Sequence, residues 1–187
     1  MWLLLTSAIA APPVTTLTDD ERTRLRAGEV VVRAVIGTSG AESTGIALVH
    51  ADPSAIWKAV LDFPARIPES ENLDTVTEYD RKGPRDWSVN FGLNIFGVGG
   101  ELNLVNHCDD SGRWCSFDLD PARQSMMSVA NGYYRVDPLE GAQLLTYFAV
   151  SKPRFYAPGF VQRLIAERDM EHMMGCLRAR SEGKTCE

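Results

Sequence analysis

The chain has 187 residues, which is the usual size of one domain with a sizeable core. Apolar residues make up 44% of it and charged residues 24%, as in ordinary globular proteins, so extensive disorder is not expected. The net charge is −6, and no run of Lys and Arg is longer than two residues. Proteins that bind nucleic acids need a basic stripe, so the composition excludes that class and disfavours electrostatic binding to anionic membranes.

Residues 1–11 differ from the rest of the chain. They carry no charged side chain, are too short to span a bilayer and end in small residues. Ala8-Ile9-Ala10 fits the A-x-A pattern of signal-peptide cleavage, and Pro12-Pro13 would end a helix there. The segment lacks the basic residue that usually precedes the apolar run, so a buried N-terminal segment or a misplaced start codon is the alternative. We expect a signal peptide at residues 1–11, a domain at 12–187, and export to a periplasm or the cell exterior.

The four cysteines form an even set, which is compatible with export. Cys108 and Cys115 flank a predicted two-residue turn at Ser111-Gly112, which places the two cysteines opposite each other. Facing residues of a hairpin lie about 4.5–5.5 Å apart at Cα, within reach of a disulfide. The same register brings Asp110 opposite Arg113, a favourable pair of charges. This hairpin is therefore the best candidate for a disulfide.

The other two cysteines, Cys176 and Cys186, lie near the C-terminus and could form a second disulfide. Four reduced, unrelated thiols are the alternative. No Cys-x-x-Cys spacing and no His at a metal-binding spacing accompany them, so we expect no metal site. Surface or structural roles are therefore assigned to the three histidines, His50, His107 and His172.

The order of elements follows from caps, breakers and periodicity. Thr18 and Glu21 form a capping-box pattern at the start of a short helix, and Pro53 suits the first turn of another. Apolar and polar residues alternate along 87–95, and turn-length gaps separate consecutive strands, which indicates an antiparallel meander and an α+β fold. The expected elements are a helix at 18–27, strands at 30–36 and 43–50, a helix at 52–63, strands at 73–79, 86–95, 100–108, 113–119, 126–136 and 144–151, and a long helix at 158–181.

The predicted last helix carries its apolar side chains in two groups that point in different directions, because each residue turns the helix by about 100°. It therefore either contacts two different surfaces or kinks between the groups. The second group is rich in Met, which suits a pliable cavity wall or, alternatively, the filling of gaps in a dry core. The groups are Phe160, Val161, Leu164 and Ile165, and then Met170, Met173, Met174 and Leu177.

Several stretches carry a likeness to a known family. They are a strand that runs into a helix at Leu48–Pro64, a late strand with its turn at Asn131–Leu139, and a final strand at Leu144–Tyr147, after which Ala157–Phe160 leads into the long helix. Over residues 29–181 the order of elements resembles the START-like (helix-grip) superfamily, which includes birch-pollen-allergen-like and polyketide cyclase-like proteins. The resemblance implies a curved antiparallel sheet that grips a long C-terminal helix around a cavity for a lipid, sterol, quinone or polyketide.

The wall of such a cavity is predicted from the apolar phases of the strands and the Met-rich part of the last helix. A filled core is the alternative for each of these residues. A small-molecule site is mostly apolar with a few polar groups, and Asn90, Asn94 and Asn103 are candidates for those groups. The predicted wall consists of Trp87, Phe91, Leu93, Tyr134, Phe148, Met170 and Met173.

No catalytic constellation is visible. The chain has no G-x-S-x-G elbow, no P-loop and no G-x-G-x-x-G sequence. Asp74, Glu78 and Asp80 share the phase of one strand, which predicts a solvated sheet face or, alternatively, an acid/base group such as a cyclase would use. We therefore expect a non-enzymatic binder or carrier of an apolar small molecule, with no cofactor and no stable membrane insertion. A cyclase or aromatase, and an interaction protein with a packed core, are the alternatives.

Overall fold

The computed structural model describes residues 10–37, 40–95, 97–109, 111–156 and 159–186, without the side chains of residues 160–162 and 164–166. Nearly all of the predicted signal peptide lies outside these residues, and so does Asp110 of the predicted charge pair. The first apolar group of the predicted last helix likewise lies outside the described side chains.

The described chain forms three α-helices, one 3₁₀ helix and eight strands. In chain order they are α1 (Asp19–Arg26), β1 (Val31–Gly37), β2 (Gly40–Val49), α2 (Pro53–Leu61), η1 (Pro64–Glu69), β3 (Leu73–Arg81), β4 (Asp86–Ile95), β5 (Val98–Cys108), β6 (Trp114–Leu119), β7 (Met127–Leu139), β8 (Ala142–Pro153) and α3 (Gly159–Ser181).

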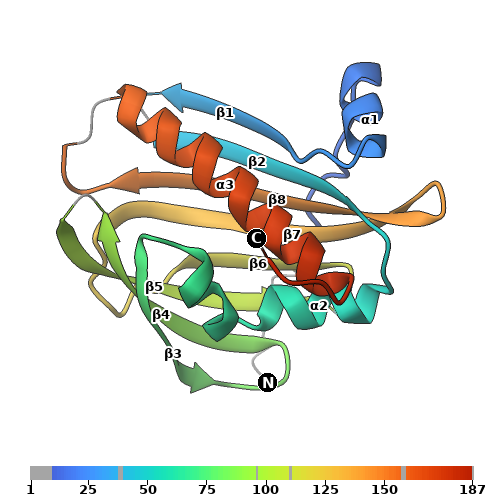
Figure 1. Cartoon of the computed structure of the whole chain (residues 1–187). Coiled ribbons are helices and arrows are strands. Elements are labelled where there is room, and N and C mark those ends of the chain that lie inside the picture. The colour runs from blue at the N-terminus through green and yellow to red at the C-terminus, as the bar shows by residue number, and fades with distance from the viewer. Residues whose placement is uncertain (1–9, 38–39, 96, 110, 157–158, 187) are drawn as a thin grey trace.

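The strands form one antiparallel sheet in the order β1-β2-β8-β7-β6-β5-β4-β3. The β1–β2 hairpin and the meander from β3 to β8 are joined where β2 pairs with β8, so the sheet curves without closing. Helix α3 crosses one face of the sheet and contacts β1 and β2, with α2 and η1 beside it (Figure 1). The α+β helix-grip architecture expected from the sequence is confirmed.

Local sequence accounts for most of the element ends. Thr18 and Glu21 form the expected capping box at the start of α1. The β7–β8 turn is tighter than predicted, because Glu140 and Gly141 both adopt positive φ angles (51° and 83°) and close a two-residue hairpin. Strand β7 therefore continues through Pro138 to Leu139, where a longer turn was expected.

Element η1 is the one that the sequence did not predict. The expected helix ended at residue 63, yet residues 64–69 form a short 3₁₀ helix with Pro64 in its first turn. The 3₁₀ helix turns the chain back toward the inner face of the sheet, where it contacts β3 and α3.

Apolar residues cover both faces of the sheet. The larger core lies on the inner face, under α2 and α3, and includes Ile56, Val60, Leu145, Met174 and Leu177, each essentially inaccessible to solvent. A smaller core on the outer face packs α1 and the residues before it against β1, β2 and β8, and it consists of Leu17, Leu25, Val31, Ile46 and Leu144. The inner face is the one that holds the candidate site.

Candidate ligand cavity

A cavity of about 770 Å³ lies between the inner face of the sheet, η1 and α3. Its volume falls in the range of roughly 300–1,000 Å³ that is typical of small-molecule sites. The sheet and Phe63 supply most of the apolar part of its lining, while η1 and the middle of α3 supply most of the charged part. The lining residues are Phe63, Arg66, Pro68, Glu69, Ser70, Glu71, Leu73, Phe91, Leu93, Leu102, Leu104, Asn106, Phe117, Tyr134, Tyr147, Arg168, Asp169, Glu171, His172 and Met173.

Five aromatic rings form the central wall. Tyr134 and Tyr147 face each other across β7 and β8, with ring centroids 4.5 Å apart. Phe117 of β6 stacks on Tyr147 at 5.8 Å. Phe91 of β4 meets the edge of Phe63 at 5.6 Å. The antiparallel register therefore brings rings from four strands onto one apolar surface, and Phe63, which lies between α2 and η1, packs against it.

A buried arginine adjoins this wall. Arg66 of η1 is only 9% exposed, and its guanidinium carbon lies 4.7 Å from the centre of the Phe63 ring and 5.3 Å from that of Tyr134. One Nη donates a hydrogen bond to the Tyr134 hydroxyl at 2.9 Å, and the other donates to the Val60 carbonyl at 2.5 Å. Burial raises the pKa of Tyr147 well above its usual value, so the hydroxyl of Tyr147 stays uncharged.

The rim is polar and links η1 to α3. Glu69 forms an ion pair with Arg180 at 2.9 Å, and both side chains are largely buried. The amide of Asn72 donates to Asp169 at 2.9 Å. Asp169 remains exposed at the rim, and its partial burial raises the pKa of its carboxyl. These two contacts link α3 to η1 and to the residues that follow η1.

Four of the residues predicted for the cavity wall line it: Phe91, Leu93, Tyr134 and Met173. The other three lie elsewhere. Trp87 is buried near the start of β4, and Met170 packs under Gly45 of β2. Phe148 lies on the outer face, stacked on Tyr133 at 5.3 Å, because side chains alternate along β8 and its neighbour Tyr147 faces inward.

The predicted polar contacts also face away from the cavity. Asn90 donates to Asn103 at 2.9 Å, and Asn103 donates to the carbonyl of Gln124 at 2.8 Å. These two residues alternate with the cavity-lining residues of their strands, so they point to the outer face, and Asn94 shares the phase of Asn90. Asn106 takes the inward position instead, and the alternation of β5 could have identified it.

The acidic residues of β3 do not reach the cavity. Asp74, Glu78 and Asp80 are exposed on a strand at the edge of the sheet, and Glu78 is paired with Arg81 at 2.5 Å.

Among the described lining residues, His172 is the one histidine. Arg66 was missed by the sequence analysis because η1 was missed, and no local pattern marks an arginine as buried.

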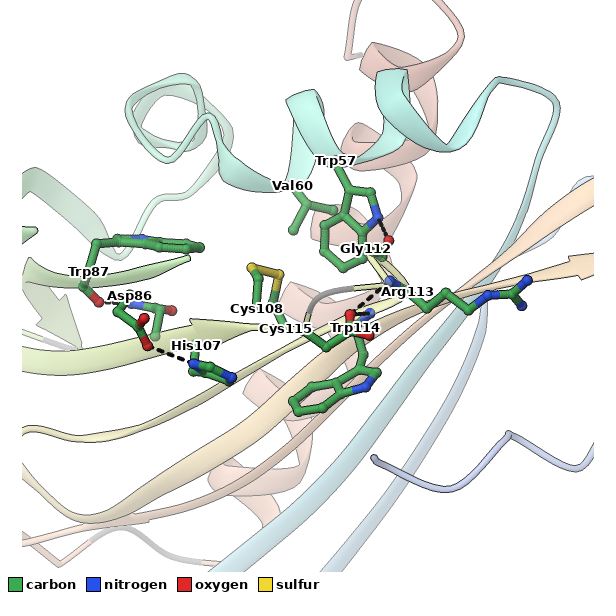
Figure 2. The surroundings of a disulfide bond; sticks show 12 residues. Trp57, Val60, Asp86, Trp87, His107, Cys108, Gly112, Arg113, Trp114 and Cys115 are labelled. Carbon is green, nitrogen blue, oxygen red and sulfur yellow. Dashed lines mark hydrogen bonds and ion pairs between the residues drawn. A yellow bond between two sulfur atoms is a disulfide. The ribbon is translucent and has the colours of Figure 1, made fainter. Parts of the chain in front are cut away.

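Both expected cysteine pairs are joined as disulfides, Cys108–Cys115 and Cys176–Cys186. Cys108 and Cys115 occupy facing positions of β5 and β6, as the hairpin argument predicted. Figure 2 shows this disulfide beneath α2, where Trp57 donates a hydrogen bond to the Gly112 carbonyl at 2.5 Å. The disulfide thus joins β5 to β6, and the tryptophan links their hairpin to α2.

One cluster of the described residues has the composition of a metal site. The ring of His172 and the sulfur atoms of Cys176 and Cys186 lie within 4.8 Å of one another. Those sulfur atoms are bonded to each other, and a disulfide is not the thiolate ligand that zinc requires. With the Cys176–Cys186 disulfide formed, this cluster therefore has a structural role.

Comparison with known proteins gives the fold its class. No protein-family model matches the sequence, and no curated protein is similar to it. Among solved structures, a STAR-related lipid transfer protein from Xanthomonas axonopodis superposes with a TM-score of 0.66 at 14% identity, over 81% of this chain and 92% of the other. A START superfamily protein from Mycobacterium smegmatis gives 0.56 at 19% identity, over 83% and 99%.

The di-domain aromatase/cyclase BexL of the BE-7585A biosynthetic pathway gives a TM-score of 0.56 at 8% identity, over 77% of this chain and 49% of the other. Together these likenesses establish that the chain has a START-like fold, as the sequence resemblance implied. In the described residues, no helix combines the length and the apolar character needed to cross a bilayer.

Proposed function

We propose that this protein is a non-enzymatic binder or carrier of an apolar small molecule, held between the sheet and α3. The observation that carries the proposal is the cavity of about 770 Å³, whose central wall is built from apolar and uncharged aromatic side chains. Phe91, Leu93, Tyr134 and Met173 are the proposed ligand contacts, together with Phe117 and Tyr147. The lipid-transfer function named for the Xanthomonas protein of the same fold supports the proposal.

The proposed site of action is outside the cytoplasm. Paired cysteines are typical of oxidising compartments such as a periplasm or the cell exterior. Both disulfides agree with export of the protein, which the residues at the start of the chain also suggest.

A cavity-filling variant tests the binding proposal. Leu102 lines the cavity from β5, opposite Phe91 of β4. Leu102→Trp should place an indole in the ligand space and weaken binding of a sterol, a quinone and a fatty alcohol by tenfold or more. Filling a cavity stabilises a fold by about 0.5–2 kcal/mol, so the melting temperature should be unchanged or higher. Affinity is measured by displacement of the neutral dye N-phenyl-1-naphthylamine.

The matched control is Val35→Trp, because Val35 lies on the β1 edge strand and is 64% exposed. It should leave the affinity for every probe unchanged. Equal affinities for the wild type and Leu102→Trp, with at least one probe bound, would place the binding site elsewhere. Failure of the wild type to bind any probe would reject the proposal.

A cyclase or aromatase is the second candidate, because Asp169 lines the rim of the cavity and its pKa is raised by partial burial. Asp169→Asn would then abolish turnover of a polyketide-like substrate without weakening its binding. The aromatase/cyclase that shares the fold makes this the enzymatic activity to assay first.

A further inference from the structure

Arg66 carries a positive charge into the protein without an acidic partner among the residues that the structure describes. It is 9% exposed, and its side chain lines the cavity. Among the described residues it donates hydrogen bonds to the Tyr134 hydroxyl and the Val60 carbonyl, both uncharged, and its Nε has no hydrogen-bond partner there. A guanidinium has five N–H donors, so some donors of Arg66 have no acceptor among the described residues.

A buried charge is costly unless a charge of opposite sign accompanies it. The nearest acid on the same 3₁₀ helix, Glu69, is paired with Arg180 of α3. The rings of Phe63 and Tyr134 give cation–π contacts, which offset part of the cost but supply no net charge. Tyr147 next to them stays neutral, because burial raises its pKa. The protein therefore supplies no counter-ion for Arg66 within the described residues.

We infer that the ligand supplies the counter-ion of Arg66. Arg66 anchors the carboxylate of a single-chain amphiphile, and the apolar part of this ligand lies along the aromatic wall. This inference rests on the proposed binding function and names the class of ligand. A carboxylate matches the arginine fork with two oxygens and forms short, charge-assisted hydrogen bonds. The cavity volume suits one chain of drug-like size.

The rim favours the same orientation of the ligand. Three acids line the outer part of the cavity, Glu71, Asp169 and Glu171, against one arginine, Arg168, and the imidazole of His172. Like charges repel, so a carboxylate is disfavoured at the rim relative to the interior beside Arg66. The acid group thus points inward and the chain extends toward the opening.

The test compares hexadecanoic acid with hexadecanol, two probes that differ in the head group alone. Both are measured at pH 8.5, by displacement of N-phenyl-1-naphthylamine from the full chain. Hydrogen bonds to a charged group favour binding enough to predict that the wild type binds the acid roughly tenfold to a hundredfold more tightly than the alcohol. Arg66→Gln should abolish this preference and leave the affinity for the alcohol within about threefold.

Arg26→Gln is the matched control, because Arg26 pairs with Glu140 on the surface and neither residue lines the cavity. It should retain the full preference for the acid. Should Arg66→Gln fail to fold, as judged by circular dichroism, Arg66→Lys decides: the lysine keeps the charge but loses the fork, and the ratio should fall severalfold.

Each remaining outcome contradicts a distinct statement. Equal affinities for the acid and the alcohol in the wild type would overturn the anionic-ligand inference and leave the binding function intact. A preference that survives in folded Arg66→Gln, or is unchanged in Arg66→Lys, would overturn the role of Arg66. Binding of neither probe, nor of the sterol and quinone above, would overturn the inference and the proposed function together.

Discussion

At the scale of single residues, Glu21 is the clearest case of one side chain with two structural roles. Its carboxylate completes the capping box of α1 and accepts two hydrogen bonds from Arg33 of β1, at 2.7 and 2.6 Å. The hydrogen bonds from Arg33 are the main reason that the pKa of Glu21 falls from 4.5 to about 2. Helix α1 is thereby fastened to the outer face of the sheet.

The pKa shift of Glu21 predicts a dependence of stability on pH. A carboxyl with a lowered pKa in the folded state contributes stability above its unfolded pKa of 4.5, and this stability is lost as the pH falls toward about 2. Glu21→Gln should lower the free energy of unfolding at pH 7 by about 1–2 kcal/mol, a discounted figure because Arg33 is 40% exposed. The variant should also flatten the loss of stability between pH 4.5 and 2 in urea denaturation.

Glu29→Gln is the control for this experiment, because Glu29 pairs with Arg24 on an exposed surface and should leave the free energy of unfolding nearly unchanged. An unchanged acid slope in Glu21→Gln would show that the contact with Arg33 does not couple protonation to folding.

At the scale of elements, the position of α3 against β2 decides the shape of the cavity. The helix packs tightly against Gly45, where an added Cβ would lie 2.6 Å from Met174 and 2.7 Å from Met170. Glycine is therefore required by space at this point of the strand, not by backbone conformation. Met173, between these two methionines, turns toward the cavity.

Gly45→Ala should push α3 away from the sheet or force the two methionines into new rotamers. Overpacking of this kind costs about 1–3 kcal/mol, measurable as a lower midpoint in urea denaturation. The helix also forms a wall of the cavity, so the affinity for hexadecanol should fall in parallel. Gly83→Ala is the control, because no atom lies within 4 Å of its added Cβ. Equal stability of the two variants would contradict the tight crossing.

The sequence predicted the elements with strong local signals and missed the one without them. Alternation along β4 and the facing cysteines of β5 and β6 are local patterns, and the structure has both. Element η1 has no such pattern, since its two prolines are equally compatible with an irregular turn. Arg66 lies on η1 and was missed together with it, because the burial of Arg66 depends on tertiary packing against Tyr134 and Phe63.

At the scale of the whole molecule, the sheet separates two packed regions with different tasks. The outer face is covered by α1 and the residues before it, where Arg135 and Asp137 form a buried ion pair and Arg135 also donates to the Pro12 carbonyl at 2.6 Å. The inner face is covered by α2, η1 and α3, and the cavity lies between η1, α3 and the sheet.

Sequence patterns could assign residues to faces of strands but could not decide whether the inner face was filled. Phe91 and Tyr134 would be apolar and inward in a packed core as well as in a cavity. The empty space depends on the angle at which α3 crosses the sheet and on the turn made by η1. Phe148 was misplaced for a simpler reason, since β8 has apolar residues on both faces and its alternation gives no phase.

Native mass spectrometry of the purified protein, followed by organic extraction, tests the central claim most directly. We predict that the wild type carries an apolar molecule at close to one per chain, that extraction releases it, and that Leu102→Trp is purified without it. A wild-type protein that is purified empty, and that takes up no lipid, sterol or quinone when these are added, would contradict the claim that this cavity binds a ligand.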